Sequence, residues 1–272
     1  MLPTFVIIGA MKCGTTSLHY YLAQHPEVCM PQKKETDFFI AQINYGRGPA
    51  WYESLFAHPA KACGEASPNY AKTWHFPGVP ERMHALLPEA RLIYVVRDPV
   101  ERMVSQYKHF YASGLEHRPL NAALEPAPGE CDQTPYFFDS CYHRNLLAFL
   151  DRYPLERVLV LSAEDLQTDR ETTLRRVFEF VGVDPGFQSP KFERQWHVSD
   201  NKFTTRKTLL NRILSRKWLS ALRRGVSRSI RPLAPPECQL DAGLRTRLMD
   251  RLAPEMREFR RLTGEPFSGW CV

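Results

Sequence analysis

The sequence begins with an apolar run, a glycine-containing turn and a helical pattern in immediate succession. The run covers residues 5–8, and the turn extends from Gly9 to Ser17. Apolar residues at helical spacing then follow as far as His25-Pro26. A strand that passes through a glycine turn into a helix is the usual start of a βαβ unit. This order therefore predicts an α/β fold.

Strand and helix patterns continue to alternate along the chain. Short apolar runs predict strands at 61–65, 92–96 and 158–161, and apolar periodicity predicts helices over 98–111, 168–181 and 240–262, the last broken at Pro254. Alternation of this kind predicts a mostly parallel central sheet of the P-loop type with helices on both faces. No internal repeat is visible. We predict a single domain over residues 1–272, with a surface loop at 126–129 and a basic excursion at about 197–236.

The turn Gly9-Ala10-Met11-Lys12-Cys13-Gly14-Thr15-Thr16-Ser17 has the glycine spacing of a nucleotide-binding P-loop. Backbone N–H groups in such a turn, together with the helix N-terminus, favour a phosphate or sulfate. The lysine that normally follows the second glycine reaches the terminal phosphates of a triphosphate, and the next hydroxyl binds Mg²⁺. Here Thr15 takes that place and Lys12 lies inside the loop, closer to the first bridging oxygen of a shorter donor. The competing interpretation is a plain glycine turn between strand and helix.

A second anion site is predicted where the strand over 92–96 ends. Arg97 follows that strand directly, Asp98-Pro99 opens the next helix, and Ser105 lies about two turns into it. A guanidinium and a hydroxyl placed in this way could converge on one phosphate dianion. Parallel strands end at the same edge of a sheet, where ligands bind, so both anion sites are expected there. The alternative is that Arg97 and Asp98 form a local ion pair at the helix start.

These motifs resemble those of the PAPS-dependent sulfotransferases, which use 3′-phosphoadenosine 5′-phosphosulfate as donor. The segment Lys12–Thr16 resembles the family's 5′-phosphosulfate loop, and Arg97–Ser105 resembles its 3′-phosphate site. The resemblance implies PAP as the product nucleotide and no metal ion. The donor-binding residues that it implies are Lys12, Cys13, Gly14, Thr15, Thr16, Ser17, Arg97 and Ser105.

Other segments are similar to the heparan-sulfate-type branch of that family. They are 32–39, 45–52 and 64–70, while Phe267-Ser268-Gly269-Trp270 resembles a common bacterial C-terminus. The resemblance implies a carbohydrate or glycolipid acceptor that is sulfated on a hydroxyl or an amine. Related glycan enzymes often carry a lysine where Ala66 stands here.

Sulfuryl transfer needs a stabilised leaving phosphate and a group that takes the acceptor proton. Lys12 suits the first role as a cation beside the bridging oxygen. Glu35 aligns with the general base of the resembling enzymes, although a surface glutamate would fit the charged run around it. His109, four residues after Ser105, matches a histidine near the catalytic centre of the N-sulfating branch. A packing or solvent-exposed histidine is the alternative.

The positive charge of the chain is concentrated in residues 201–236. This segment contains ten Lys or Arg and no Asp or Glu, so the remaining residues carry a net charge of −4 within a total of +6. Apolar residues recur at helical spacing from Leu209 to Leu222. Four interpretations stay open: a basic helix on an anionic membrane surface, a lid over the donor through Lys202, Arg206 and Lys207, a track for an acidic glycan, or a solvated helix.

The remaining features bear on compartment and on competing functions. Seven cysteines without a CxxC pair suit buried thiols in a reducing compartment, and pairing of Cys131 with Cys141 is left open. No signal peptide or apolar span of about 20 residues is visible, so a cytoplasmic protein is expected, with peripheral contact at the inner membrane surface as an extension.

Three other functions compete with the glycan sulfotransferase. A P-loop kinase for a small molecule would need a lysine at Thr15 and a Mg²⁺-binding aspartate. A sulfotransferase for a secondary-metabolite alcohol would share every donor motif. A nucleic-acid-binding protein would rely on the basic segment, but the rest of the chain is net acidic, so no nucleic-acid partner is expected. No His, Cys or Asp cluster in the sequence has metal-ligand spacing.

Overall fold

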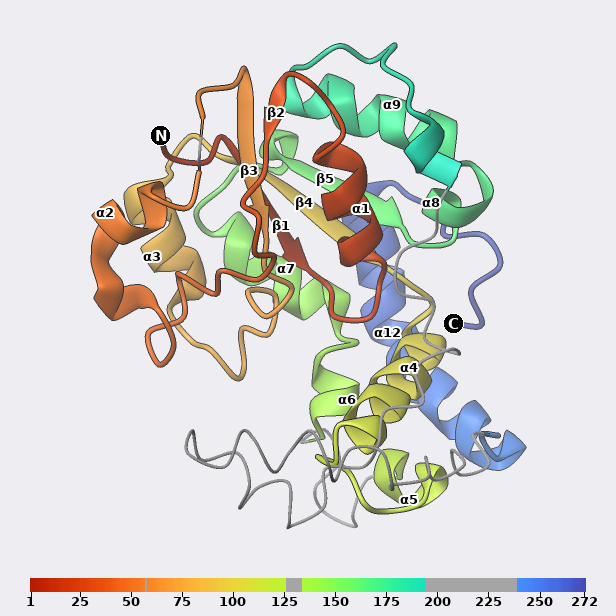
Figure 1. Cartoon of the computed structure of the whole chain (residues 1–272). Coiled ribbons are helices and arrows are strands. Elements are labelled where there is room, and N and C mark those ends of the chain that lie inside the picture. The colour runs from red at the N-terminus through yellow and green to blue at the C-terminus, as the bar shows by residue number, and fades with distance from the viewer. Residues whose placement is uncertain (57, 126–133, 194–238) are drawn as a thin grey trace, which may run out of the picture.

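A five-stranded parallel sheet forms the centre of the chain in this computed structural model, which describes residues 1–56, 58–125, 134–193 and 239–272. The strands are β1 (Phe5–Gly9), β2 (Val28–Cys29), β3 (Ala62–Ala66), β4 (Arg91–Val96) and β5 (Val158–Ser162). Their order in the sheet is β2-β3-β1-β4-β5, and every neighbouring pair is parallel (Figure 1). The predicted fold class, an α/β domain with a P-loop-type parallel sheet, is confirmed.

The strands consist of apolar runs because both of their faces are covered. All residues of β1 and β3 are buried, and β4 is buried from Leu92 to Val96. Gly64 of β3 pairs with Phe5 of β1, and a Cβ at Gly64 would lie 2.1 Å from the Phe5 ring. A glycine is therefore required where β3 passes this ring.

Helices cover both faces of the sheet (Figure 1). The chain runs from β1 toward the β2 edge through α1 (Thr15–Leu22). It runs toward the β5 edge through α3 (Val79–Leu86), between β3 and β4, and through α7 (Tyr142–Leu150), between β4 and β5. Because parallel crossovers are right-handed, α1 covers one face of the sheet and α3 and α7 cover the other. α9 (Arg170–Val181) packs against the turn that follows α1, since its Phe178 ring lies 4.8 Å from that of His25. α12 (Ala242–Thr263) joins α7 through Tyr142 and Phe259, whose ring centroids are 5.7 Å apart.

One helix, α4 (Pro99–Ala112), leaves the sheet and runs toward α5 (Leu120–Leu124) and α6 (Pro135–Phe138) (Figure 1). Its inner face and the first half of α12 build a second apolar cluster that includes Val100, Met103, Tyr107 and Leu248. The shorter helices are α2 (Gly48–Glu53), α8 (Asp165–Thr168) and the 3-10 turns η1 (Tyr45–Arg47), η2 (Leu155–Arg157) and η3 (Pro190–Glu193).

The predicted break at Pro254 is wrong, because α12 continues through this residue to Thr263. Proline removes one backbone hydrogen bond and crowds the preceding turn. Here the same face of the helix is buried on both sides of the proline, at Leu248 and Leu252 before it and at Met256 and Phe259 after it. Tertiary burial outweighs the local cost.

Several predictions fall on residues that the structure does not describe. These are the loop at 126–129, the basic segment 201–236 within the excursion at 197–236, and Cys131. Cys141 is buried, and its thiol donates to the Phe137 carbonyl oxygen at 3.4 Å. Within the described ranges, no helix is long and apolar enough to cross a membrane.

Candidate active site

The candidate site residues gather at the carboxyl edge of the sheet. β1 and β4 are neighbours, yet the chain leaves them toward opposite sides of the sheet, which is the arrangement that opens a ligand crevice. The two strand ends are joined by a hydrogen bond of 2.5 Å from the Ala10 N–H to the Val95 carbonyl oxygen. Two segments 80 residues apart in the sequence, the loop after β1 and the start of α4, therefore meet at one place.

The loop after β1 has the backbone of an anion-binding turn. Lys12 and Gly14 adopt left-handed φ values of 71° and 86°, and α1 begins directly afterwards at Thr15. Such a turn directs successive N–H groups inward, and the N-terminus of a helix adds further N–H donors. Thr15 is buried, whereas Lys12, Thr16 and Ser17 are half-buried. The donors expected from the sequence are thus presented by one continuous turn.

The side chain of Cys13 points away from solvent and into the core. Its Sγ lies 3.8 Å from the Tyr142 hydroxyl, which donates to the Arg97 carbonyl oxygen at 2.8 Å. Burial raises the pKa of the Cys13 thiol to about 12, so the thiol stays neutral. Only the main chain of Cys13 is left to face a ligand. Tyr142 of α7, which belongs to no recognisable sequence motif, ties the loop to the Arg97 backbone.

Arg97 lies just before α4, and Ser105 lies about two turns into this helix. Within the described ranges, neither side chain has a hydrogen bond or ion pair with another residue. Arg97 is half-buried and Ser105 is buried. The ion pair between Arg97 and Asp98 does not form. The Asp98 carboxylate instead caps α4, accepting from the Val100 and Glu101 N–H groups at 3.0 Å each.

Glu35, in the segment after β2, has a left-handed backbone conformation. In the described part of the chain four non-glycine residues have positive φ, and three belong to this edge of the sheet: Lys12, Glu35 and Asp37, with φ of 71°, 66° and 47°. Such a conformation costs on the order of 1 kcal/mol for a non-glycine residue. The Glu35 carboxylate is about half exposed and pairs with Lys34 Nζ at 2.5 Å. The neighbouring Asp37 turns its carboxylate to the Asn69 amide at 3.2 and 3.3 Å.

Between Glu35 and Asp37, Thr36 points inward to a carboxylate that anchors the whole segment. Glu65 of β3 is fully buried and accepts hydrogen bonds from four hydroxyl groups. The donors are Thr36 at 2.5 Å, Tyr52 at 2.6 Å, Ser67 at 2.8 Å and Tyr70 at 2.8 Å. Burial raises the pKa of Glu65 above its ordinary value. Because its oxygens are occupied by the protein, Glu65 positions the segment and does not face a ligand.

Burial also changes the acidity of Asp37. Its pKa is raised, first by burial and further by the negative charge of Glu35, although the Asn69 amide partly opposes the shift. Asp37 is therefore a second carboxylate at this edge that can hold a proton more readily than an exposed aspartate.

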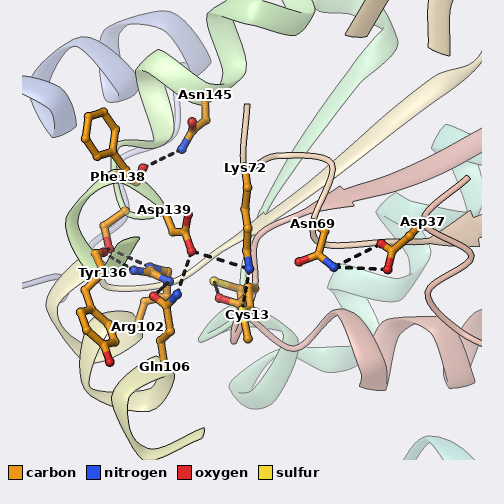
Figure 2. Close-up of polar contacts among 12 residues, drawn as sticks. Cys13, Asp37, Asn69, Lys72, Arg102, Gln106, Tyr136, Phe138, Asp139 and Asn145 are labelled. Carbon is orange, nitrogen blue, oxygen red and sulfur yellow. Dashed lines mark hydrogen bonds and ion pairs between the residues drawn. The ribbon is translucent and has the colours of Figure 1, made fainter. Parts of the chain in front are cut away.

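One lysine at this edge belongs to none of the sequence motifs. Lys72, in the loop after β3, brings its Nζ to 3.0 Å from the Met11 Sδ of the loop after β1 and to 3.8 Å from Asp139 Oδ2. Figure 2 shows it between Asp139 on one side and Asn69 and Asp37 on the other. No motif or periodicity marks this lysine, because only the path of the loop brings it to the site.

His109 is exposed in the last turn of α4, one turn beyond Ser105. Ala66 is buried at the end of β3. In the part of the chain with described coordinates, no group of three or more His, Cys, Asp or Glu side chains could hold a metal ion.

Comparison with known proteins gives one consistent family. A family profile described as "Sulfotransferase domain" matches residues 2–229. The chain is 30% identical over 198 residues to the human bifunctional heparan sulfate N-deacetylase/N-sulfotransferase 2, a match that covers 68% of this chain and 22% of the relative. It is 32% identical over 192 residues to mouse heparan sulfate glucosamine 3-O-sulfotransferase 3B1, covering 67% of this chain and 46% of that relative. The chain thus matches less than half the length of either relative.

The fold is shared with a solved bacterial protein. A crystal structure of a sulfotransferase from Alicyclobacillus acidocaldarius superposes with a TM-score of 0.73, over the full length of both chains and with 24% identity. At this level of identity the likeness establishes the fold and not the chemistry.

Proposed function

The chain belongs to the sulfotransferase family, and from that premise we propose that it transfers a sulfuryl group from PAPS to a hydroxyl or an amine of a carbohydrate acceptor. The observation that carries the proposal is that the two predicted anion-binding segments meet at neighbouring strand ends. The loop at Lys12 follows β1, and the uncommitted side chains of Arg97 and Ser105 follow β4. PAPS carries anionic groups at its 5′ and 3′ positions, so it needs two such sites.

The donor roles follow from the chemistry of each group. The N–H donors and hydroxyls from Lys12 to Ser17 suit the 5′-phosphosulfate, and Arg97 with Ser105 suits the 3′-phosphate. Lys12 is placed in the loop where a cation would stabilise the negative charge that develops on the leaving phosphate oxygen. We assign no metal ion to this transfer.

The chemical step requires a base for the acceptor proton and an acceptor atom in line with the bond that breaks. The acceptor oxygen or nitrogen forms a bond to sulfur while the bond from sulfur to the bridging oxygen breaks, and that electron pair stays on the phosphate of PAP. The acceptor proton passes to Glu35, which lies within electrostatic reach of Lys72 beside the phosphate loop. His109 remains a second candidate for proton transfer, one turn beyond Ser105.

A carbohydrate acceptor is supported by two features. The relatives named above are a heparan sulfate N-sulfotransferase and a glucosamine 3-O-sulfotransferase. In addition, Trp74 is 50% exposed and stacks on Phe138 at 4.7 Å, so one face of a rigid indole is held open two residues beyond Lys72. An aromatic face of this kind suits the apolar C–H face of a sugar ring, on a free glycan or on a glycolipid.

Binding of the product nucleotide tests the donor assignment. Calorimetry with PAP in EDTA should show binding, and ATP should bind at least tenfold more weakly, because no site for its terminal phosphates and Mg²⁺ is proposed. ATP binding that equals PAP binding and requires Mg²⁺ would replace this proposal with a small-molecule kinase.

Transfer of label tests the acceptor. PAPS carrying ³⁵S would be offered with de-N-sulfated heparin, with fully desulfated N-acetylated heparin, with a glycolipid and with an aryl alcohol. Incorporation into the first polymer only indicates an amine acceptor, and incorporation into the second indicates a hydroxyl. Exclusive labelling of the aryl alcohol would favour a secondary-metabolite substrate instead. Membrane contact through residues 201–236 and a cytoplasmic location remain predictions.

A further inference from the structure

Lys72 is a buried cation whose hydrogen-bonding capacity is not filled by the residues that the structure describes. Its side chain is 12% exposed, and an ammonium group carries three N–H donors. The Met11 thioether at 3.0 Å is a weak acceptor, and Asp139 at 3.8 Å is beyond hydrogen-bond distance. An ammonium buried to this degree is normally paired and hydrogen-bonded. Among the described contacts, Lys72 therefore keeps N–H donors that could serve an anion.

The position of Lys72 is fixed by contacts on two sides. The next residue, Thr73, donates to the Asn145 side-chain oxygen at 3.1 Å, which ties the loop to α7. On the other side Asp139 is held by the Gln106 amide at 2.8 Å, and Gln106 in turn accepts from Arg102 at 2.9 Å. Figure 2 shows this chain of contacts leading from α4 to Lys72.

The surroundings of Lys72 identify which part of a donor it would meet. On the loop side it touches Met11, the residue before Lys12. On the other side it lies within electrostatic reach of Glu35 and Asp37, the carboxylates of the acceptor side. In sulfuryl transfer, the group between the donor phosphate and the base is the sulfuryl group itself.

We propose that Lys72 is a further catalytic residue, whose ammonium group donates hydrogen bonds to the non-bridging oxygens of the sulfuryl group before and during transfer. This inference rests on the proposed function. Lys72 neither gains nor loses a proton in the step, since the acceptor proton goes to Glu35. Asp139 and Gln106 act as positioning residues, because they orient Lys72 without touching the donor.

The proposal makes donor binding depend on the charge of Lys72. Burial lowers the pKa of Lys72 below its ordinary value of 10.5, and Asp139 partly opposes the shift. The charged or titratable groups that face Lys72 are Asp139, Arg102, Asp37, Glu35 and His75. Because the folded state disfavours the charged form, replacing Lys72 with methionine should not lower the thermal midpoint.

The test compares PAPS with PAP, which lacks the sulfuryl group, so that no acceptor is needed. Lys72→Met should lower the ratio of PAPS affinity to PAP affinity about tenfold, the loss of one charge-assisted hydrogen bond, while PAP affinity stays within twofold. Asp139→Asn should lower the ratio less, and it should add nothing in the Lys72→Met background. The exposed Lys61, at the opposite end of β3, supplies the matched control Lys61→Met, which should leave the ratio unchanged.

A pH series separates a charge from a structural effect. In the wild type the preference for PAPS should decline as pH rises through the lowered pKa of Lys72, and in Lys72→Arg it should persist to higher pH. An unchanged ratio in Lys72→Met would overturn the proposal, as would an equal decline with pH in the wild type and Lys72→Arg. A wild-type protein that binds neither PAP nor PAPS would instead refute the proposed function.

Discussion

The side chains at the carboxyl edge of the sheet form two groups. Some are hydrogen-bonded within the protein, and others have polar groups that could bind a ligand. Cys13 and Glu65 are fully buried and satisfied by neighbouring groups, so they shape the site from behind. Arg97 and Lys72 carry charge that the described protein leaves incompletely paired. Buried or half-buried cations of this kind lower stability unless an anion binds. The residues of the second group are therefore the ones at which substitutions should affect function more than folding.

Glu35→Gln tests the assignment of the base. The substitution keeps the size of the side chain but removes its basicity, so turnover of a hydroxyl acceptor should fall by about 10²- to 10⁴-fold. PAP affinity should stay unchanged, because the side chain is half exposed on the acceptor side of the loop. Steady-state kinetics and calorimetry measure the two effects. Weak PAP binding with preserved turnover would make Glu35 structural and direct attention to Asp37 or His109.

Arg97→Ala tests the 3′-phosphate site. Loss of one charge-assisted contact should weaken PAP binding by about 1.5–3 kcal/mol. The thermal midpoint should stay near that of the wild type, since the guanidinium has no hydrogen bond or ion pair with any other described residue. Adenosine 5′-phosphosulfate lacks the 3′-phosphate and serves as the matched ligand, whose affinity should not change. An equal loss for both ligands would contradict the assignment.

At the scale of elements, the site is assembled from segments that follow different strands. The loop after β1 supplies Lys12, the segment after β2 supplies Glu35, and the loop after β3 supplies Lys72, while Arg97 follows β4. Parallel strands bring these ends together whatever their separation in the sequence. Buried polar contacts then hold these segments in place, as the hydrogen bond from the Thr36 hydroxyl to the Glu65 carboxylate does for the segment after β2.

The connection between α4 and α6 is secured by a different carboxylate. Glu116 accepts from the Arg118 guanidinium at 2.8 Å and from the Tyr136 hydroxyl at 3.0 Å. The Arg118 side chain is the main reason that the pKa of Glu116 falls from 4.5 to about 2. A carboxyl group with a lowered pKa stabilises the fold above its ordinary pKa and loses that contribution as pH falls through its folded value.

Glu116→Gln should therefore lower the free energy of unfolding by about 2 kcal/mol at pH 7. The difference from the wild type should shrink between pH 4.5 and pH 2, where the wild-type carboxyl group takes up its proton. Urea unfolding at pH 7 and pH 3 measures both values. Glu258→Gln, which removes an exposed i,i+3 pair with Arg261, is the control and should change little at either pH. A difference independent of pH would refute the role of the charge.

At the scale of the whole molecule, the residues after α12 pack against the core beside the start of α4. Trp270 stacks on Phe267 at 4.3 Å and donates to Glu164 at 3.2 Å. Glu164 also accepts from the Asp98 N–H at 3.1 Å, and the Cys271 N–H donates to the Asp98 carboxylate at 2.7 Å. The segment after α12 thus reaches the helix cap next to Arg97.

Trp270→Ala should lower the free energy of unfolding by about 3 kcal/mol, because it removes a stacked ring and one hydrogen bond. PAP affinity should fall as well, since the Asp98 cap loosens. Trp270→Phe keeps the stacking and should recover most of the stability. Denaturant unfolding and calorimetry measure the two quantities, and an unchanged midpoint in Trp270→Ala would show that the segment is only peripheral.

The sequence by itself determined the α/β class, the position of the phosphate loop and the start of α4. These features depend on short-range signals: apolar runs long enough for buried strands, a glycine at a left-handed φ, and a capping Asp98 followed by proline. Two strand ends of a parallel sheet must share an edge, so the sequence also predicted that the loop at Lys12 and Arg97 would lie close together.

The tertiary structure decided the features that depend on packing between distant segments. The continuation of α12 through Pro254 follows from burial on both sides of the proline, which no local pattern reveals. Glu65 gathers hydroxyl groups of residues between 36 and 70, and Lys72 lies beside Met11 in a loop that Thr73 ties to α7. A lone lysine carries no periodicity, so its proximity to Met11 is a property of the fold and not of its sequence neighbours.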